Sequence, residues 1–126
     1  MKKILLGITG SVAAYKSLEI ARELKQNGYL VECIITESAE LFISPFLLRS
    51  FGFKVYSSRD IFASSNPMMH IELAKSADHI VIAPASANFL AKIAHGFADC
   101  LLSSVCLAFN DQLFIAPAMN LSLIHI

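Results

Sequence analysis

The stretch Lys3-Ile-Leu-Leu-Gly-Ile-Thr9-Gly10-Ser11 decides the fold, because a short apolar run ends abruptly in a glycine and a hydroxyl residue. Such a run is typical of a buried strand. Ser11 can cap a helix that continues to Asn27, and Gly28 then ends it. Leu30 to Thr36 is a second apolar run of the same kind. This order of elements indicates two parallel strands joined by a helical crossover.

The rest of the chain continues the alternation of strands and helices. Residues 51–67 are the least regular stretch, and only a short strand near 54–56 is expected there. The other predicted elements are helices at 37–44 and 45–49, a strand at 78–83, helices at 85–95 and 97–109, and a strand at 113–116. Continuous apolar strands between helices imply an α/β fold: a Rossmann-like, flavodoxin-type doubly wound parallel sheet in three layers. Residues 1–126 are predicted to form a single domain.

The composition is unusually apolar. Hydrophobic residues make up 56% of the chain and charged residues 16%, against roughly 45–50% and 25% in typical soluble proteins. A small domain has too much surface to bury this surplus alone, so we expect apolar faces that pack against other subunits. We expect no membrane partner, because there is no run of about 18 uncharged apolar residues.

Charge and cysteine content narrow the classes of partner. Ten basic and ten acidic side chains are spread along the chain, so we expect no nucleic-acid partner. Cys33, Cys100 and Cys106 lie in apolar contexts, which suits reduced thiols and a cytoplasmic protein. The cysteines and histidines show no metal-ligand spacing, so no metal site is predicted.

Four strand ends are candidates for a binding site. Right-handed crossovers would place Gly10, Thr36, Pro84 and Pro117 at the carboxyl ends of their strands. Ligands of open α/β sheets bind at that edge. We therefore expect these four segments to converge on one site.

The Gly10-Ser11 turn is suited to a phosphate group. Gly10 lets the backbone approach a phosphate closely, and the Ser11 hydroxyl and free N–H groups at the helix start can bind it. The turn lacks the third glycine and the later acidic residue of a dinucleotide fingerprint, so a mononucleotide fits better than NAD. The alternative interpretation is an ordinary capped turn without a ligand.

Three later segments carry a family resemblance. They are His70-Ile-Glu-Leu73 before the strand at 78–83, Pro84-Ala-Ser-Ala-Asn88 after it, and Pro117-Ala-Met-Asn120 after the last strand. In this order and at these separations they resemble the flavoprotein cysteine decarboxylases, in particular the phosphopantothenoylcysteine decarboxylase branch. The resemblance covers nearly the whole chain, from the first strand to Asn120.

The resemblance implies an FMN-dependent carboxy-lyase. Its reaction would be the decarboxylation of 4′-phospho-N-pantothenoylcysteine to 4′-phosphopantetheine in coenzyme A biosynthesis, and its assembly a homo-oligomer built from trimers. His70 and Asn120 are then the catalytic residues, since a histidine suits proton transfer near neutral pH. The residues implied to bind FMN are Gly10, Ser11, Thr36, Phe42, Pro84, Ala85, Ser86, Ala87, Asn88 and Ala118.

Several of these residues also have purely structural interpretations. Thr36 can cap a helix, Phe42 can be a core aromatic, and a lone histidine such as His70 is more often structural than catalytic. His70 also comes shortly before the amino-terminal end of a strand, so only tertiary assembly would bring it to a binding site, such as one shared with a neighbouring subunit. Its catalytic role therefore rests on the resemblance.

The chain also departs from the family pattern. Phe89 stands where the family usually has threonine, Cys100 where it has asparagine, and Leu123 where it has methionine. Family members continue past the asparagine into a flap that covers the substrate, so we expect a C-terminally incomplete decarboxylase domain. Two alternatives stay open: an oxidative decarboxylase of a peptide C-terminal cysteine, and a non-catalytic FMN-binding regulatory subunit. A flavin prenyltransferase is disfavoured, because that branch lacks the histidine and asparagine pair.

Overall fold

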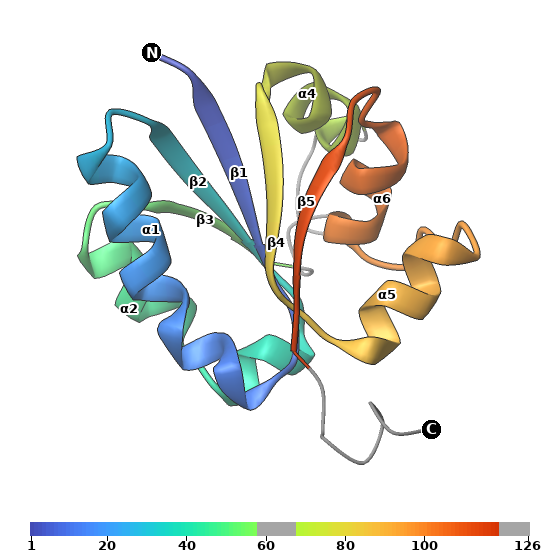
Figure 1. Cartoon of the computed structure of the whole chain (residues 1–126), viewed down its shortest axis with the longest axis horizontal. Coiled ribbons are helices and arrows are strands. Elements are labelled where there is room, and N and C mark those ends of the chain that lie inside the picture. Colours follow the sequence, from blue (N-terminus) through green and yellow to red (C-terminus); the bar gives the residue numbers. More distant parts are fainter. Residues whose placement is uncertain (58–67, 119–126) are drawn as a thin grey trace.

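The computed structural model describes residues 1–57 and 68–118, whose five strands form one parallel sheet (Figure 1). The strands are β1 Lys3–Ile8, β2 Leu30–Ile35, β3 Lys54–Ser57, β4 His79–Ala85 and β5 Leu113–Pro117. Their spatial order is β3-β2-β1-β4-β5, and every neighbouring pair is parallel. The chain thus builds outward from β1 in both directions, which confirms the predicted doubly wound sheet.

Helices cover both faces of the sheet. They are η1 Val12–Lys16, α1 Ser17–Gln26, η2 Ser38–Leu41, α2 Pro45–Ser50, α4 Met69–Ser76, α5 Ala87–Ala94 and α6 Leu101–Ala108. Figure 1 shows α1 and α2 on one side of the sheet and α4, α5 and α6 on the other. Among the described residues, no helix combines the length and the apolar character that a membrane crossing needs.

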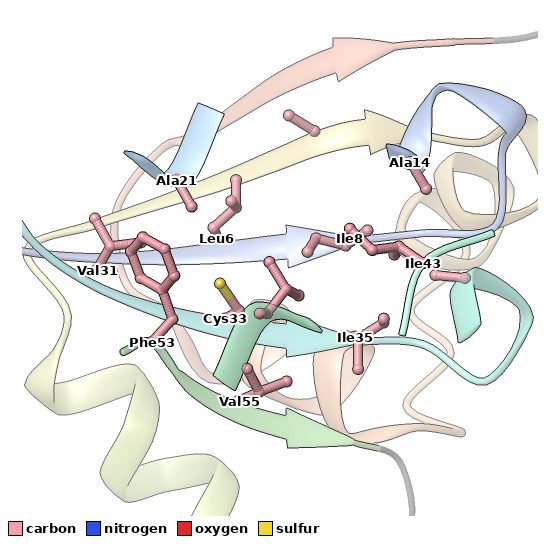
Figure 2. Packing of buried hydrophobic residues seen from close by; sticks show 13 residues of the cluster. Leu6, Ile8, Ala14, Ala21, Val31, Cys33, Ile35, Ile43, Phe53 and Val55 are labelled. Atoms are coloured by element: carbon pink, nitrogen blue, oxygen red, sulfur yellow. The ribbon is translucent and has the colours of Figure 1, made fainter. Parts of the chain in front are cut away.

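Two hydrophobic cores separate the three layers. Alternate side chains of a strand point to opposite faces, and β1 accordingly sends Leu6 and Ile8 to one core and Leu5 to the other. Figure 2 shows the first core, in which Leu6 and Ile8 lie beside Cys33 and Ile35 of β2. Because both faces of β1 are buried, its sequence is a continuous apolar run rather than an alternating one.

Several predicted helices differ from those observed. The helix expected from Ser11 to Asn27 is divided into the 3₁₀ turn η1 and the helix α1. The helix expected at 37–44 is only the short 3₁₀ turn η2, because Ser44 precedes Pro45 and has extended backbone angles, φ −81° and ψ 132°. The helix expected from residue 97 begins only at Leu101. Gly96 has a positive φ of 74°, and Cys100 is again extended, so the residues between them do not continue a helix.

Strand β4 also runs further than predicted. It continues through Pro84 and Ala85, and Ala85 pairs with Pro117 of β5 after a register shift that begins at Ile82. The helix that follows therefore starts at Ala87 rather than at Ala85. The segment 84–88 is thus a strand end and a helix start joined by Ser86, rather than an extended loop.

Hydrogen bonds join the strand ends at the carboxyl edge of the sheet. Thr36 N–H donates to the Ile8 carbonyl at 3.0 Å, which joins the ends of β2 and β1. Thr9 N–H donates to the Pro84 carbonyl at 3.3 Å, joining β1 to β4. Ala118 N–H donates to the Ala85 carbonyl at 3.0 Å, joining β5 to β4. The four strand ends therefore meet at one edge of the sheet, as predicted.

Candidate cofactor site

A cavity of about 760 Å³ lies at the carboxyl edge of the sheet. Its walls come from the ends of β1, β2 and β4, from η2 and α5, and from the residues just before α6. The lining residues are Thr9, Thr36, Glu37, Ser38, Leu41, Ser86, Asn88, Phe89, Lys92, Asp99 and Cys100. The volume falls within the roughly 300–1,000 Å³ of small-molecule sites. The cavity is located where the strand order reverses, which is the expected place for a ligand in an open α/β sheet.

Three of the predicted residues, Thr36, Ser86 and Asn88, line this cavity. Thr36 is buried, and its hydroxyl accepts a hydrogen bond from Ala39 N–H at 3.4 Å. Ser86 caps α5 by accepting a hydrogen bond from Phe89 N–H at 3.2 Å. Asn88 follows in the first turn of that helix. The structural and the ligand-facing interpretations are therefore compatible for Thr36 and Ser86.

Gly10 and Ser11 lie next to the cavity without lining it. Ser11 caps η1 by accepting a hydrogen bond from Ala13 N–H at 3.2 Å. A Cβ atom on Gly10 would lie only 2.6 Å from the Cβ of Ser38, which is a lining residue. The absence of a side chain at Gly10 is therefore required for the β1 and β2 ends to pack together, whether or not a phosphate approaches.

Four predicted residues, Pro84, Ala85, Ala87 and Ala118, lie at the strand and helix ends near the cavity. Pro84 and Ala85 end β4, and Ala85 is fully buried. Ala87 opens α5 next to the capping residue. Ala118 holds the end of β5 against that of β4 through its bond to Ala85. None of the four is among the lining residues.

Phe42 and His70 do not line the cavity. Phe42 ends η2 and is 43% exposed, so the alternative interpretation of Phe42 as a core aromatic is wrong. His70 is half-buried in the first turn of α4. Figure 1 shows α4 beside the end of the sheet at which β4 begins, opposite the carboxyl edge. A single chain therefore does not bring His70 to the cavity. Asn120 lies outside the described residues.

Charged residues on the cavity wall were not predicted from the sequence. Lys92 Nζ lies 3.0 Å from Asp99 Oδ2, which ties the last turn of α5 to the segment before α6. The hydrogen bond from Lys92 lowers the pKa of Asp99. The two residues are seven positions apart across Gly96, a spacing that carries no recognisable sequence signal. Among the other lining residues that were not predicted, Thr9 had the clearest sequence signal, because it directly follows the first strand.

The three thiols differ in their environment. Burial raises the pKa of Cys33 and of Cys106 to about 12, so both stay protonated and unreactive at neutral pH. Cys100 is only half-buried and lines the cavity. Within residues 1–57 and 68–118, no three His, Cys, Asp or Glu side chains are grouped so that they could hold a metal ion.

Comparison with known proteins places the whole chain in one family. The family model described as Flavoprotein matches residues 1–125. A Streptococcus mutans protein named probable phosphopantothenoylcysteine decarboxylase is 45% identical over 124 residues, covering 94% of this chain and 68% of that protein. The coenzyme A biosynthesis bifunctional protein CoaBC of Haemophilus influenzae is 43% identical over 125 residues. This chain spans only 31% of that bifunctional protein.

Solved structures share the fold closely. A PPC decarboxylase mutant complexed with pantothenoylaminoethenethiol superimposes with a TM-score of 0.91 at 36% identity, over 99% of this chain and 71% of that one. The FMN binding protein AtHal3 superimposes with a TM-score of 0.87 at 38% identity, over 94% of this chain and 66% of that one. The peptidyl-cysteine decarboxylase EpiD superimposes with a TM-score of 0.86 at 32% identity, over 100% of this chain and 75% of that one.

Proposed function

Because this chain belongs to the Flavoprotein family, we propose that it binds FMN and decarboxylates 4′-phospho-N-pantothenoylcysteine to 4′-phosphopantetheine, a step of coenzyme A biosynthesis. The observation that carries the proposal is the cavity at the carboxyl edge of the sheet. The name of the Streptococcus mutans relative and the ligand of the PPC decarboxylase structure support the choice of substrate.

The lining residues fit FMN in size and in chemistry. The hydroxyl groups of Thr36, Ser38 and Ser86 are close enough to line one cavity and can bind a phosphate or the polar edge of a flavin. The wall carries two acids, Glu37 and Asp99, and Lys92 is already paired with Asp99. A phosphate would therefore be bound by hydroxyl and backbone N–H groups rather than by a free cation.

The chain's own residues would orient the substrate and move protons. FMN, when bound, supplies the oxidation and reduction that make loss of carbon dioxide easy. We assign proton transfer to His70 and binding of the substrate carboxylate to Asn120, whose amide both donates and accepts hydrogen bonds. Since His70 is not at the cavity of its own chain, it would act at the cavity of a neighbouring subunit.

Exposed apolar side chains support a homo-oligomer, which we propose is built from trimers. Large hydrophobic residues are exposed on or next to η1, η2 and α2: Val12, Tyr15, Leu41, Phe42, Phe46, Leu47 and Phe51. Large exposed apolar areas typically mark interaction sites. The buried, protonated thiols of Cys33 and Cys106 agree with a cytoplasmic location, which we also propose.

Sedimentation velocity at micromolar concentration is expected to show trimers or multiples of trimers. The physical reason is that association would remove the exposed aromatic and aliphatic side chains of η1, η2 and α2 from water. Phe46→Ser, at a residue that is 76% exposed, should shift the distribution toward smaller species. A well-folded, flavin-loaded monomer would contradict the proposed assembly.

The purified protein is expected to contain FMN. Denaturation and chromatography of the released chromophore should give FMN rather than FAD or NAD.

Turnover of two offered substrates then separates the candidate functions. Carbon dioxide from phosphopantothenoylcysteine supports the proposal, whereas carbon dioxide only from a peptide with a C-terminal cysteine indicates the peptide decarboxylase. FMN binding without turnover of either substrate indicates a regulatory subunit, and a protein that takes up no FMN contradicts the site itself.

Ser86→Ala is expected to weaken FMN binding, and Ser44→Ala is not. Both serines cap a helix: Ser86 accepts from Phe89 N–H at 3.2 Å, and Ser44 accepts from Phe46 N–H at 3.1 Å. Each change should therefore cost a similar amount of stability, about 0.5–2 kcal/mol. Only Ser86 lines the cavity. Flavin titration of both variants measures the difference, and equal affinities would remove Ser86 from the site.

A further inference from the structure

Thr9 makes an unusual connection between two strand ends. It is 1% exposed, and its hydroxyl donates to the Pro84 carbonyl at 2.6 Å. The same oxygen accepts a hydrogen bond from Ser86 N–H at 2.8 Å. One buried side chain thus binds the residues on both sides of Ala85, and it also lines the cavity.

This connection replaces strand pairing at the place where the pairing stops. The register of β1 with β4 extends from Ile4 opposite His79 to Gly7 opposite Ile82. The pairing of β4 with β5 becomes irregular between Ile82 and Ala85. Strand pairing therefore places the end of β4 less securely than its middle. Within the described residues, Thr9 supplies the contacts that hold this segment from the β1 side.

The position of this segment decides where the first turn of α5 points. Ser86 is the residue that joins β4 to α5, and its own hydroxyl is already used to cap the helix at Phe89 N–H. Its backbone N–H is satisfied by Thr9. If that bond were lost, a backbone donor at the cavity wall would need a new partner, and a small rotation of the segment would move Ser86 and Asn88 together.

We infer that Thr9 is a positioning residue for the cofactor: its hydroxyl holds the junction of β4 and α5 so that Ser86 and Asn88 face the flavin. The inference rests on the proposed function, because it takes FMN as the occupant of the cavity. Thr9 acts through this junction and takes no part in the chemistry. Thr9 thereby contributes to the site by aligning Ser86 and Asn88.

Three variants test the inference. Thr9→Val keeps the size and branching of the side chain but removes both hydrogen bonds, whereas Thr9→Ser keeps the hydroxyl. Ser76→Ala is the matched control at the opposite edge of the sheet. The Ser76 hydroxyl likewise donates to a carbonyl, that of Leu73 at 2.9 Å, and accepts from Lys3 Nζ at 2.8 Å.

Two measurements are made on each variant. Flavin titration should show FMN binding about 10-fold weaker in Thr9→Val, which corresponds to the loss of about one to two net hydrogen bonds. Thr9→Ser should stay within about 3-fold of the unmodified protein on the same scale, and Ser76→Ala should not change the affinity. Without flavin, amide hydrogen exchange should be faster at Ser86 in Thr9→Val and unchanged there in Ser76→Ala.

The outcomes separate the inference from the proposed function. Normal FMN affinity or normal Ser86 exchange in a folded Thr9→Val protein would overturn the positioning role. If Thr9→Ser also loses normal FMN affinity or normal Ser86 exchange, the positioning role is overturned as well, because side-chain packing rather than the hydroxyl would then be responsible. If valine prevents folding, Thr9→Ala replaces it in the comparison with serine. An unmodified protein that binds no FMN would overturn the proposed function and the cofactor part of the inference, even where the exchange result holds.

Discussion

Replacement of His70 by asparagine is expected to leave FMN bound and to lower turnover by about 10²–10⁴-fold, the usual contribution of a general acid or base. His70 lies in the first turn of α4 and does not line the cavity of its own chain. Its loss should therefore affect proton transfer rather than the cofactor. Flavin absorbance and carbon dioxide release measure the two effects separately.

His95→Asn is the matched control for this prediction. His95 is exposed and ends α5, and substitutions of exposed residues usually change stability little. The His95→Asn variant should therefore retain normal turnover. Unchanged turnover in His70→Asn would remove the catalytic assignment.

Mixing two inactive variants tests whether His70 acts across a subunit boundary. His70→Asn and Asn120→Ala should each be inactive when assembled alone. If the two residues of one site come from different chains, oligomers assembled from a mixture will contain some intact sites. Activity should then reappear after joint refolding or coexpression. Complete absence of activity in hybrids that still bind FMN would place both residues in the same chain.

Replacement of Leu102 by alanine is expected to lower the free energy of unfolding by about 2–5 kcal/mol. Leu102 is 1% exposed and belongs to the core between the sheet and α4, α5 and α6. Truncation would leave a cavity against β1, since the surrounding strands can collapse only partly. Leu107→Ala is the control on the same helix: Leu107 is 61% exposed, so its change should stay within about 0.5 kcal/mol. Urea unfolding measures both.

A second substitution makes this prediction more specific. A Cβ atom on Gly7 would lie 2.7 Å from Leu102 Cδ1 and 2.8 Å from Ile82 Cδ1. Gly7→Ala should therefore destabilise the unmodified protein but cost less in the Leu102→Ala background, where one of the two obstructing side chains is gone. A coupling of about 0.5–3 kcal/mol is expected for residues in contact. Strictly additive effects would contradict the described contact between β1 and α6.

Local sequence predicted those parts of the site that depend on strand ends. Apolar runs that were predicted to end at or just before Gly10, Thr36 and Pro84 belong to parallel strands, and their carboxyl ends must meet at one edge. Strand order placed Thr36 at this edge, whereas Ser86 and Asn88 were implied by the family resemblance; all three lie on the cavity wall. Lys92 and Asp99 were not predicted, because they meet only when α5 and the segment before α6 have packed.

The ends of several elements were predicted less well than the existence of the strands, because these ends also depend on contacts that the local sequence does not show. The turn at Ser38–Leu41 was expected to be a longer helix, but the backbone of Ser44 must be extended before Pro45. The end of β4 was placed too early, because its last two residues are held by pairing with β5 and by the hydroxyl of Thr9. Neither partner can be recognised from the residues of β4 alone.

The sequence by itself thus determined the parallel sheet, its cores and the edge at which a ligand would bind, since hydrophobic runs and turn residues act within a few positions of one another. The tertiary structure decided which side chains share the cavity wall, that Thr9 spans the ends of β1 and β4, and that His70 lies away from the cavity of its own chain. These relations depend on contacts between residues distant in the chain, such as Thr9 and Ser86. Strand register and helix packing set those distances, and no local pattern of residue types encodes them.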